Sequence, residues 1–227
     1  EIAAGVTRAQ SRTVLETISG DDPNAAATRF AVFVHYDGGG VVHEYVLTYV
    51  RALQKAGFRI WFVSNAPRFA PAAVGSVKPH VTRILRRNNY GYDFGAYKDG
   101  ILDVLAGERP DMLLTCNDSV YGPFHDLGKV IADATAERAD VWGMTESYEK
   151  RYHLQSYFVL FHRRAVEAPQ FRRHWQELPY IDARGWLIHR GEVALTQALV
   201  RAGLSVGALY PMERIETALR RQLEAFD

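Results

Sequence analysis

Two short polar stretches contain the residues of this sequence that are best suited to chemistry. Positions 88–100 read NNYGYDFGAYKDG, and positions 117–119 read Asn-Asp-Ser directly after an apolar run. Asparagine and aspartate at a loop-to-helix junction cap free backbone N–H groups, and the positive end of a helix attracts a phosphate or a carboxylate. A strand that ends in a carboxylate and a hydroxyl builds a site at the carboxyl edge of an α/β sheet. Together the two stretches predict a site for an anionic ligand.

The hydrophobic spacing predicts the strands and helices that must position this site. Strands are expected at 29–36, 58–63, 81–85, 111–116, 141–145, 154–162 and 206–209. Helices are expected at 6–18, 41–57, 94–106, 127–136, 164–178, 192–202 and 214–226, the fifth of them interrupted near Pro169. Strand and helix alternate over the first two-thirds of the chain. This order predicts an α/β fold with a mostly parallel, mixed sheet that is flanked by helices on both faces.

Composition limits the classes of protein to which the chain can belong. Its 227 residues suit either one large domain or a domain with a small appendage. We expect an N-terminal leader or helix over 1–28 and a single domain over 29–227, excised from a larger protein. The formal net charge of +1, with 27 basic and 26 acidic residues interspersed, argues against nucleic acid as a partner. The single cysteine, Cys116, excludes an intrachain disulfide.

The two polar stretches, read in full as NNYGYDFGAYKDG and CNDSVYGP and followed by HLQSYFVLF at 153–161, resemble the rhamnan synthesis protein F family. The resemblance covers about residues 29–211. That family comprises bacterial polysaccharide-assembly proteins with a GT-A-type, Rossmann-like glycosyltransferase domain. The resemblance implies transfer of a sugar, often a deoxysugar such as rhamnose, from a nucleotide donor to a growing cell-surface glycan such as an O-antigen. It also implies a place in the cytoplasm or at the inner face of the cytoplasmic membrane.

The resemblance raises the question of a metal. In GT-A enzymes an Asp-x-Asp motif binds a divalent metal on the donor diphosphate, and here this position reads Asn117-Asp118-Ser119. Only one carboxylate is present, whereas hard cations take several oxygen ligands. Two alternatives follow: Asp118 holds Mg²⁺ or Mn²⁺ with few protein ligands, or it binds the sugar hydroxyls without a metal.

The implied sugar transfer needs a pocket for the nucleotide diphosphate and electrostatic stabilisation of the leaving phosphate. The ends of the first two expected strands should hold the base and ribose, and the two polar stretches should hold the phosphates and ribose. The expected donor-binding residues are His35, Tyr36, Asp37, Ser64, Asn65, Asn89, Gly91, Asp93, Lys98, Asn117 and Ser119. The expected donor is a dTDP-, UDP- or GDP-linked sugar.

Sugar transfer also needs a base that removes the proton of the acceptor hydroxyl. The candidates are Glu192, Glu146 and Asp93. Glu192 is preferred, because the base of inverting GT-A enzymes often begins a helix late in the domain, and it joins Asp118 as the expected catalytic pair. Glutamate in the first turn of a helix is also an ordinary choice that the helix dipole favours. A glycan or a lipid-linked glycan is the expected acceptor, with contacts from His153, Gln155 and Trp186.

Two other functions compete with sugar transfer. A nucleotide-sugar-binding scaffold domain without turnover, part of a larger polysaccharide-assembly enzyme with other domains, would also explain the reduced motif at 117–119. Product release that Asp118→Ala abolishes in a folded protein favours catalysis, and donor binding without turnover favours the scaffold. A dinucleotide-dependent Rossmann enzyme ranks lowest, because Gly38-Gly39-Gly40 lacks the G-x-G-x-x-G spacing.

Overall fold

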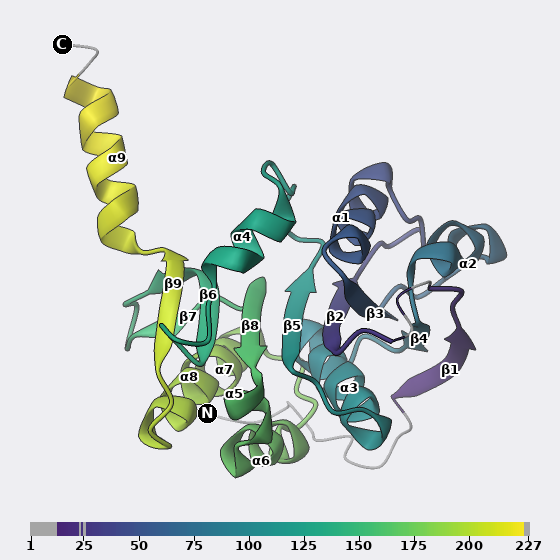
Figure 1. Cartoon of the computed structure of the whole chain (residues 1–227). Coiled ribbons are helices and arrows are strands. Elements are labelled where there is room, and N and C mark those ends of the chain that lie inside the picture. The colour runs from purple at the N-terminus through teal and green to yellow at the C-terminus, as the bar shows by residue number, and fades with distance from the viewer. Residues whose placement is uncertain (1–12, 23, 25, 225–227) are drawn as a thin grey trace.

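The computed structural model describes residues 13–22, 24 and 26–224, and these form one mixed sheet between two layers of helices (Figure 1). The strands are β1 Val14–Ser19, β2 Arg29–His35, β3 Phe58–Ser64, β4 Arg83–Arg87, β5 Met112–Asn117, β6 Val141–Ser147, β7 His153–Leu154, β8 Phe158–His162 and β9 Val206–Tyr210. The helices are α1 Glu44–Lys55, α2 Pro71–Val77, the 3₁₀ turn η1 Lys78–His80, α3 Tyr92–Gly107, α4 Leu127–Asp133, α5 Arg163–Glu167, α6 Pro169–Glu177, α7 Arg184–Leu187, the π-helical η2 Ile188–Val193, α8 Ala194–Arg201 and α9 Met212–Glu224.

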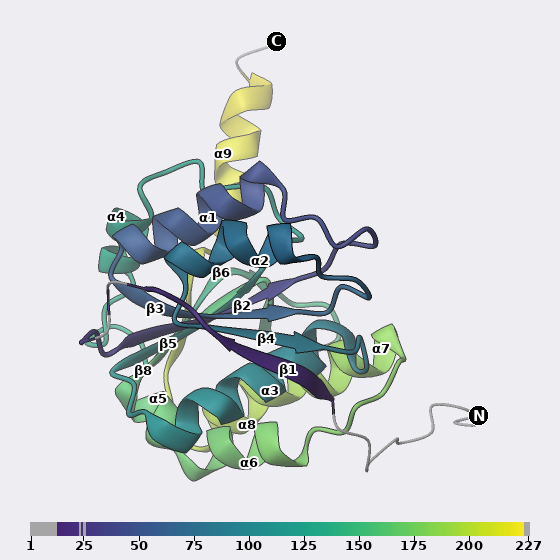
Figure 2. The same ribbon diagram turned by 90° about the vertical axis from the view of Figure 1, so that its right-hand side faces the viewer.

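The strand order confirms the expected mostly parallel, mixed sheet. The order is β1-β4-β3-β2-β5-β8-β6-β7, and β9 pairs with β6. The neighbours β4, β3, β2 and β5 run parallel to one another, whereas β8 runs antiparallel to β5 and β6. In Figure 2 the helices α1, α2 and α4 cover one face of the sheet, and α3, α5, α6 and α8 cover the other. The carboxyl ends of the four parallel strands therefore meet at one edge.

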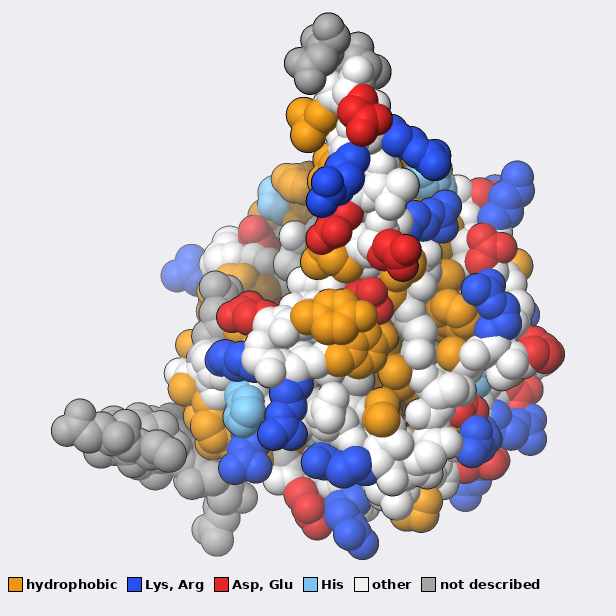
Figure 3. Space-filling model, turned by 90° about the vertical axis from the view of Figure 1, so that its left-hand side faces the viewer, with side chains coloured by type: hydrophobic (Ala, Val, Ile, Leu, Met, Phe, Trp, Pro, Cys, Tyr) orange, Lys and Arg blue, Asp and Glu red, His pale blue; other side chains and the backbone are white. Residues whose placement is uncertain are grey.

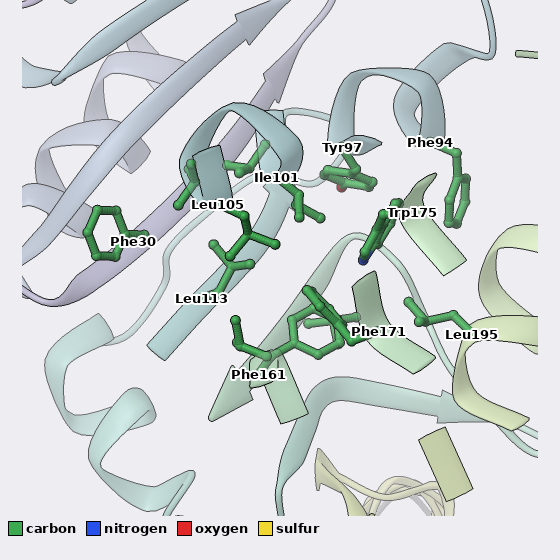
Figure 4. Packing of buried hydrophobic residues seen from close by; sticks show 14 of the residues in the cluster. Phe30, Phe94, Tyr97, Ile101, Leu105, Leu113, Phe161, Phe171, Trp175 and Leu195 are labelled. Carbon is green, nitrogen blue, oxygen red and sulfur yellow. The ribbon is translucent and has the colours of Figure 1, made fainter. Parts of the chain in front are cut away.

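The apolar core lies on both faces of β2. Val32 and Val34 belong to the layer under α3, and Ala31 and Phe33 belong to the layer under α1. Burial on both faces explains why this strand is a continuous apolar run. The layer on the α3 side holds Tyr97, Ile101, Leu105, Phe161, Phe171 and Trp175 (Figure 4).

Close packing fixes the position of α3 on the sheet. A Cβ atom at Gly100 would lie 2.5 Å from Cγ1 of Val32 and 3.0 Å from Cγ2 of Val63, so only glycine permits this approach. The first turn of α3 is thereby held beside the carboxyl ends of β2 and β3.

Three expected elements differ from the structure. The described part of the helix expected at 6–18 is the strand β1, and residues 6–12 lie outside the described residues. The strand forms because the edge of β4 offers it a backbone partner. The strand expected at 154–162 is divided into β7 and β8, because the backbone N–H of Ser156 bonds the carboxylate of Glu192. The helix expected at 192–202 begins earlier, at Arg184, through α7 and η2.

The last helix, α9, extends away from the rest of the molecule (Figure 1). None of its residues is buried, and the space-filling view shows acidic, basic and apolar side chains on its surface (Figure 3). Among the described residues, no helix has both the length and the apolar composition that crossing a bilayer requires.

Candidate active site

A cleft of about 800 Å³ opens beyond the carboxyl ends of β2 and β5, between the first turn of α3 and the η2 segment. Asn89 and Asp93 from the first polar stretch line it, as does Asp118 from the second. The two stretches therefore converge on one cleft, as the sequence predicts. Glu192, the preferred base, lines the same cleft. The carboxylates Asp93, Asp118 and Glu192 and the tyrosines Tyr36, Tyr45 and Tyr92 dominate its chemistry.

Asp118 follows the last residue of β5 and lies beside the end of β2. Its Oδ2 accepts a hydrogen bond from the N–H of Tyr36 at 3.0 Å and lies 4.0 Å from Nε2 of His35. Burial raises the pKa of Asp118 to about 6, the negative charge of Asp93 acts in the same direction, and the hydrogen bond from Tyr36 opposes both. A bound cation or a hydrogen-bond donor on a ligand would favour the charged form of such a carboxyl group.

The turn that enters α3 has left-handed backbone conformations at two successive residues. Gly91 has φ 72° and Tyr92 has φ 47°, a conformation that a tyrosine rarely adopts. The N–H of Gly91 donates to Oδ1 of Asp182 at 2.8 Å, and Nδ2 of Asn65 donates to the carbonyl of Tyr92 at 3.3 Å. Residues around the turn thus hold a strained backbone, and such strain often occurs at ligand sites.

Asn117 connects the two polar stretches. Its Nδ2 donates to Oδ2 of Asp93 at 2.9 Å, and its Oδ1 accepts from the hydroxyl of Ser119 at 2.7 Å. Asn117 is itself buried, so it orients Asp93 and Ser119 rather than lining the cleft.

Sequence reasoning misses two residues that hold the turn from behind, Arg87 and Asp99. The buried guanidinium of Arg87 donates to Asp99 Oδ2 at 2.7 Å, to Asn65 Oδ1 at 2.8 Å and to the carbonyl of Tyr90 at 2.8 Å. Asn65, expected to bind the donor, is 1% exposed and takes part in this network. No feature of the sequence distinguishes Arg87 from the other arginines of β4, so its position is visible only in the structure.

His35 and Ser64 also lie behind the cleft. Nε2 of His35 donates to the carbonyl of Val41 at 3.1 Å, which leaves Nδ1 to accept from the Ser64 hydroxyl at 3.1 Å. Burial lowers the pKa of His35, in agreement with a neutral ring. Asp37 closes the same loop, because its Oδ1 accepts hydrogen bonds from the N–H groups of Gly39 and Val41. These three side chains shape the loop after β2, and Tyr36 is the residue of this loop that lines the cleft.

Lys98, also expected to bind the donor, does not line the cleft. Its Nζ donates to the carbonyls of Gln176 at 3.0 Å and Leu178 at 2.6 Å, and it lies 4.7 Å from the centre of the Tyr180 ring. The side chain therefore fastens the end of α6 to α3. Gly91, another expected donor contact, supplies the turn conformation described above.

Glu192 is held firmly at the wall of the cleft. Its Oε1 accepts from the backbone N–H of Ser156 at 3.0 Å and from the Ser156 hydroxyl, and its Oε2 lies 3.7 Å from Nε2 of His153. The preceding Gly191 packs against Phe94, where a Cβ atom would lie 2.5 Å from the ring. Glu192 belongs to the π-helical η2, and π-helical turns occur frequently at functional sites.

The other sequence candidates lie outside the cleft lining. Of the three base candidates, only Glu192 and Asp93 line the cleft. Oε1 of Glu146 accepts a hydrogen bond from the N–H of Met212 instead. His153 is buried behind Glu192, and Oε1 of Gln155 accepts from the hydroxyl of Thr145 at 2.6 Å. Trp186 packs against the apolar layer on the α3 side. The three expected acceptor contacts therefore do not come together at the cleft.

The oxygen atoms of the cleft suit a divalent cation that the protein binds through only a few ligands. Within the described residues, no group of three or more His, Cys, Asp or Glu side chains is arranged to hold a metal ion. Asp93, Asp118 and the hydroxyl of Ser119 line one cleft. This smaller set fits a hard divalent cation that takes its remaining ligands from phosphate and water.

The fold and the site define an α/β protein with an acidic cleft at the carboxyl edge of a mixed sheet. Residues 60–222 match the family described as rhamnan synthesis protein F, and the chain belongs to that family. This match confirms the family that the two polar stretches indicate.

Curated relatives extend beyond the matched region. The chain is 29% identical over 195 residues to the uncharacterized protein y4gN of Sinorhizobium fredii, which covers 84% of this chain and 50% of the relative. It is 31% identical over 143 residues to the virulence protein VirA of Vibrio anguillarum, and this match covers 61% of this chain and 45% of the relative. The chain thus spans about half the length of these relatives.

A mannosyltransferase structure from Pyrobaculum calidifontis, in complex with GDP-Man and Mn²⁺, is similar with 10% identity and a TM-score of 0.42 over 70% of this chain and 50% of that one.

Proposed function

We propose that this chain is a glycosyltransferase domain that moves a sugar from a nucleotide-sugar donor to a growing bacterial polysaccharide. Its family membership supports the class of reaction. The observation that carries the proposal is the presence of Asp93, Asp118 and Glu192 on one cleft. Asp93 and Asp118 belong to the two polar stretches expected to bind the donor. Glu192 comes from a separate wall of the cleft, where an acceptor can approach.

The charge of the cleft supports a cation in donor binding. None of the described residues that line the cleft is lysine or arginine, so this described lining offers no positive side chain to a diphosphate. Asp118, with Asp93, would hold Mg²⁺ or Mn²⁺, and such a cation would offset the charge of the diphosphate as the sugar leaves. The exposed rings of Tyr36 and Tyr92 offer apolar faces to the nucleoside.

The proposed reaction assigns one step to Glu192. Its carboxylate accepts the proton of the acceptor hydroxyl while the hydroxyl oxygen forms a bond to the anomeric carbon of the sugar. The bond between that carbon and the phosphate oxygen breaks, and the nucleoside diphosphate leaves with the electron pair. Attack from the face opposite the leaving group inverts the anomeric configuration. Ser156 and His153 keep the carboxylate in place during this step.

The finer assignments follow from the family description. Rhamnose or a related deoxysugar is the proposed sugar, a cell-envelope glycan such as an O-antigen is the proposed product, and a glycan or lipid-linked glycan is the proposed acceptor. The proposed place of the reaction is the cytoplasm or the inner face of the cytoplasmic membrane, where nucleotide sugars are available. The longer relatives suggest that other domains of the same polypeptide act beside this one.

A thermal-shift screen of dTDP-, UDP- and GDP-linked sugars, with and without Mn²⁺, tests the proposal. Binding to the native state raises the apparent Tm, so one nucleotide class should raise it, and more strongly with Mn²⁺. Glu192→Gln should keep this shift and lose at least about 100-fold in the rate of transfer, in line with the loss of a general base. Glu146→Gln is the matched control and should behave as the wild type does.

Two results would contradict the proposal. If no nucleotide sugar changes the Tm, the cleft does not bind the donor. If a donor binds but no glycan acceptor releases its nucleoside diphosphate, the chain is the non-catalytic scaffold domain instead.

A further inference from the structure

A second hollow of about 260 Å³ lies next to the cleft, between α1, α4 and the strands β6, β8 and β9. We call it the aromatic groove, after the six aromatic residues in its lining. They are Tyr49, Tyr121, Phe124, Tyr157, Phe158 and Tyr210. Tyr121 is 70% exposed and Phe124 is 83% exposed, so two large rings stand in solvent at this place. Exposed apolar surface that gathers in one hollow marks a binding site more often than a single exposed side chain does.

The aromatic groove and the cleft share a wall. Ser119 lines the cleft and the next residue, Val120, lines the groove; Ser156 lines the cleft and Tyr157 lines the groove. On α1, Tyr45 faces the cleft. The rings of Tyr45 and Tyr121 lie 4.7 Å apart, and this pair forms part of the boundary. A ligand that occupies the groove can therefore reach the cleft without crossing the body of the protein.

The groove adjoins the cleft from the α1 side. Tyr157 packs on the layer under α1, whereas Ser156 binds the carboxylate of Glu192 through its backbone N–H and its hydroxyl, and Gly191 packs against Phe94 of α3. The groove and Glu192 therefore lie on opposite sides of the cleft, and a ligand in the groove enters the cleft beside Tyr45.

The chemistry of the groove selects a neutral ligand with flat apolar faces and hydroxyl groups. None of the described residues in its lining is Asp, Glu, Lys or Arg, and His125 is the one histidine among them. A charged ligand would therefore lose its hydration and gain no permanently charged partner. Aromatic rings carry negative charge on their faces, which attracts the weakly positive C–H groups of a sugar ring. Tyrosine hydroxyls at the rim can donate to and accept from sugar hydroxyls.

We propose that the aromatic groove is an acceptor subsite, which holds the sugar units behind the one whose hydroxyl enters the cleft. The proposal rests on the proposed sugar transfer and adds where the growing glycan lies. It replaces His153, Gln155 and Trp186, which do not line the cleft, with Tyr121 and Phe124 as the residues that recognise the acceptor.

Binding of oligosaccharides in the absence of any donor tests this subsite. The probes are short rhamnose, galactose and glucose oligosaccharides, with Kd measured by calorimetry and ring contacts detected by saturation-transfer NMR. At least one probe should bind the wild-type chain, and Tyr121→Ala and Phe124→Ala should each weaken it by about three- to tenfold, the range for loss of one aromatic contact. Tyr148→Ala removes a ring that is 64% exposed and lies outside both hollows, and it should leave the Kd unchanged.

The outcomes separate the subsite from the proposed reaction. If no probe binds, or if the variants bind the oligosaccharide as the wild type does, the subsite is refuted, whatever the donor screen gives. Binding of decyl phosphate in place of every oligosaccharide would refute it too, since an alkyl chain would then be the occupant. If oligosaccharides bind in the groove but no nucleotide sugar binds in the cleft, the subsite stands and sugar transfer fails.

Discussion

Asp118 shows how a single carboxyl group is changed by the place to which the chain brings it. It follows a buried strand and lies near His35, whose neutral ring offers it no positive charge. Burial and the charge of Asp93 raise its pKa to about 6. At neutral pH, Asp118 is therefore ionised in surroundings that destabilise its charged form. A pKa shifted in this way is typical of binding and catalytic groups.

Asp118→Asn should stabilise the metal-free protein at pH 7.5. The folded-state pKa of about 6 lies above the ordinary value of 3.8, so the folded state binds the proton more tightly than the unfolded state. The Asp118 term thus favours folding as the pH falls through 6 toward 4, and it costs stability above pH 6. Asparagine removes that cost, which is roughly 1–3 kcal/mol. The free energy of unfolding in denaturant, with EDTA present, measures it at pH 7.5 and pH 5.

Asp133→Asn, at an exposed position of α4, serves as the control and should change the free energy of unfolding little at either pH. A variant Asp118→Asn that is less stable than the wild type at pH 7.5 would contradict the assignment of a strained carboxylate.

At the scale of the element, the first turn of α3 determines which side chains reach the cleft. Its backbone is left-handed at Gly91 and Tyr92, and it is held by Arg87 from behind and by Asp182 from the side. Gly95 completes the turn because it lies against the carbonyl oxygen of Tyr90 and the guanidinium of Arg87. The glycines and the buried arginine together allow a tyrosine and an aspartate to project into one cleft.

Gly95→Ala should destabilise the protein by about 1–3 kcal/mol, the usual cost of overpacking. A Cβ atom at this position would lie 2.2 Å from the carbonyl oxygen of Tyr90 and 2.8 Å from Nη2 of Arg87. Gly75→Ala is the matched control, because Gly75 lies inside α2 with no atom within 4 Å of an added Cβ. It should stabilise the protein by about 0.5–1 kcal/mol. Urea denaturation measures both, and a Gly95→Ala variant as stable as the wild type would show that the turn can move.

At the scale of the whole molecule, the sheet and its two helical layers form one body from which α9 extends (Figure 1). β9 belongs to the body, since it pairs with β6 along the strand from Val206 to Tyr210. α9 has no buried residue. The hydrogen bond that the N–H of Met212 donates to the carboxylate of Glu146 is exposed to solvent. β9 supplies Tyr210 to the lining of the aromatic groove, whereas no described residue of α9 lines the groove or the cleft.

Truncation after Pro211 should leave the body folded, with a change in Tm of less than about 3 °C. Truncation after Ser205 removes β9 as well, uncovers the edge of β6, and should lower the Tm by roughly 10 °C, the equivalent of about 3–4 kcal/mol for a chain of this size. Differential scanning calorimetry of the two shortened chains measures the difference. Equal melting temperatures for both truncations would show that β9 contributes no stability to the sheet.

The sequence by itself determines the strands β2, β3 and β5 and the convergence of the two polar stretches. The apolar runs are long enough to be buried on both faces, and parallel strands place the residues that follow them at one edge of the sheet. Asn89, Asp93 and Asp118 therefore come together because of local pattern and simple topology. Glu192 lines the same cleft, and its proposed role as the base comes from the resemblance to inverting GT-A enzymes.

Only the tertiary structure decides the contacts between segments that are distant in the chain. Arg87 with Asp99, Ser156 with Glu192, and Tyr45 with Tyr121 each join different elements, and no periodicity in the sequence records such pairs. The edge strand β1 likewise forms because β4 is free to pair with it. Hydrophobic spacing depends on neighbours within a few residues, whereas the orientation of a polar side chain depends on whichever distant group satisfies its hydrogen bonds.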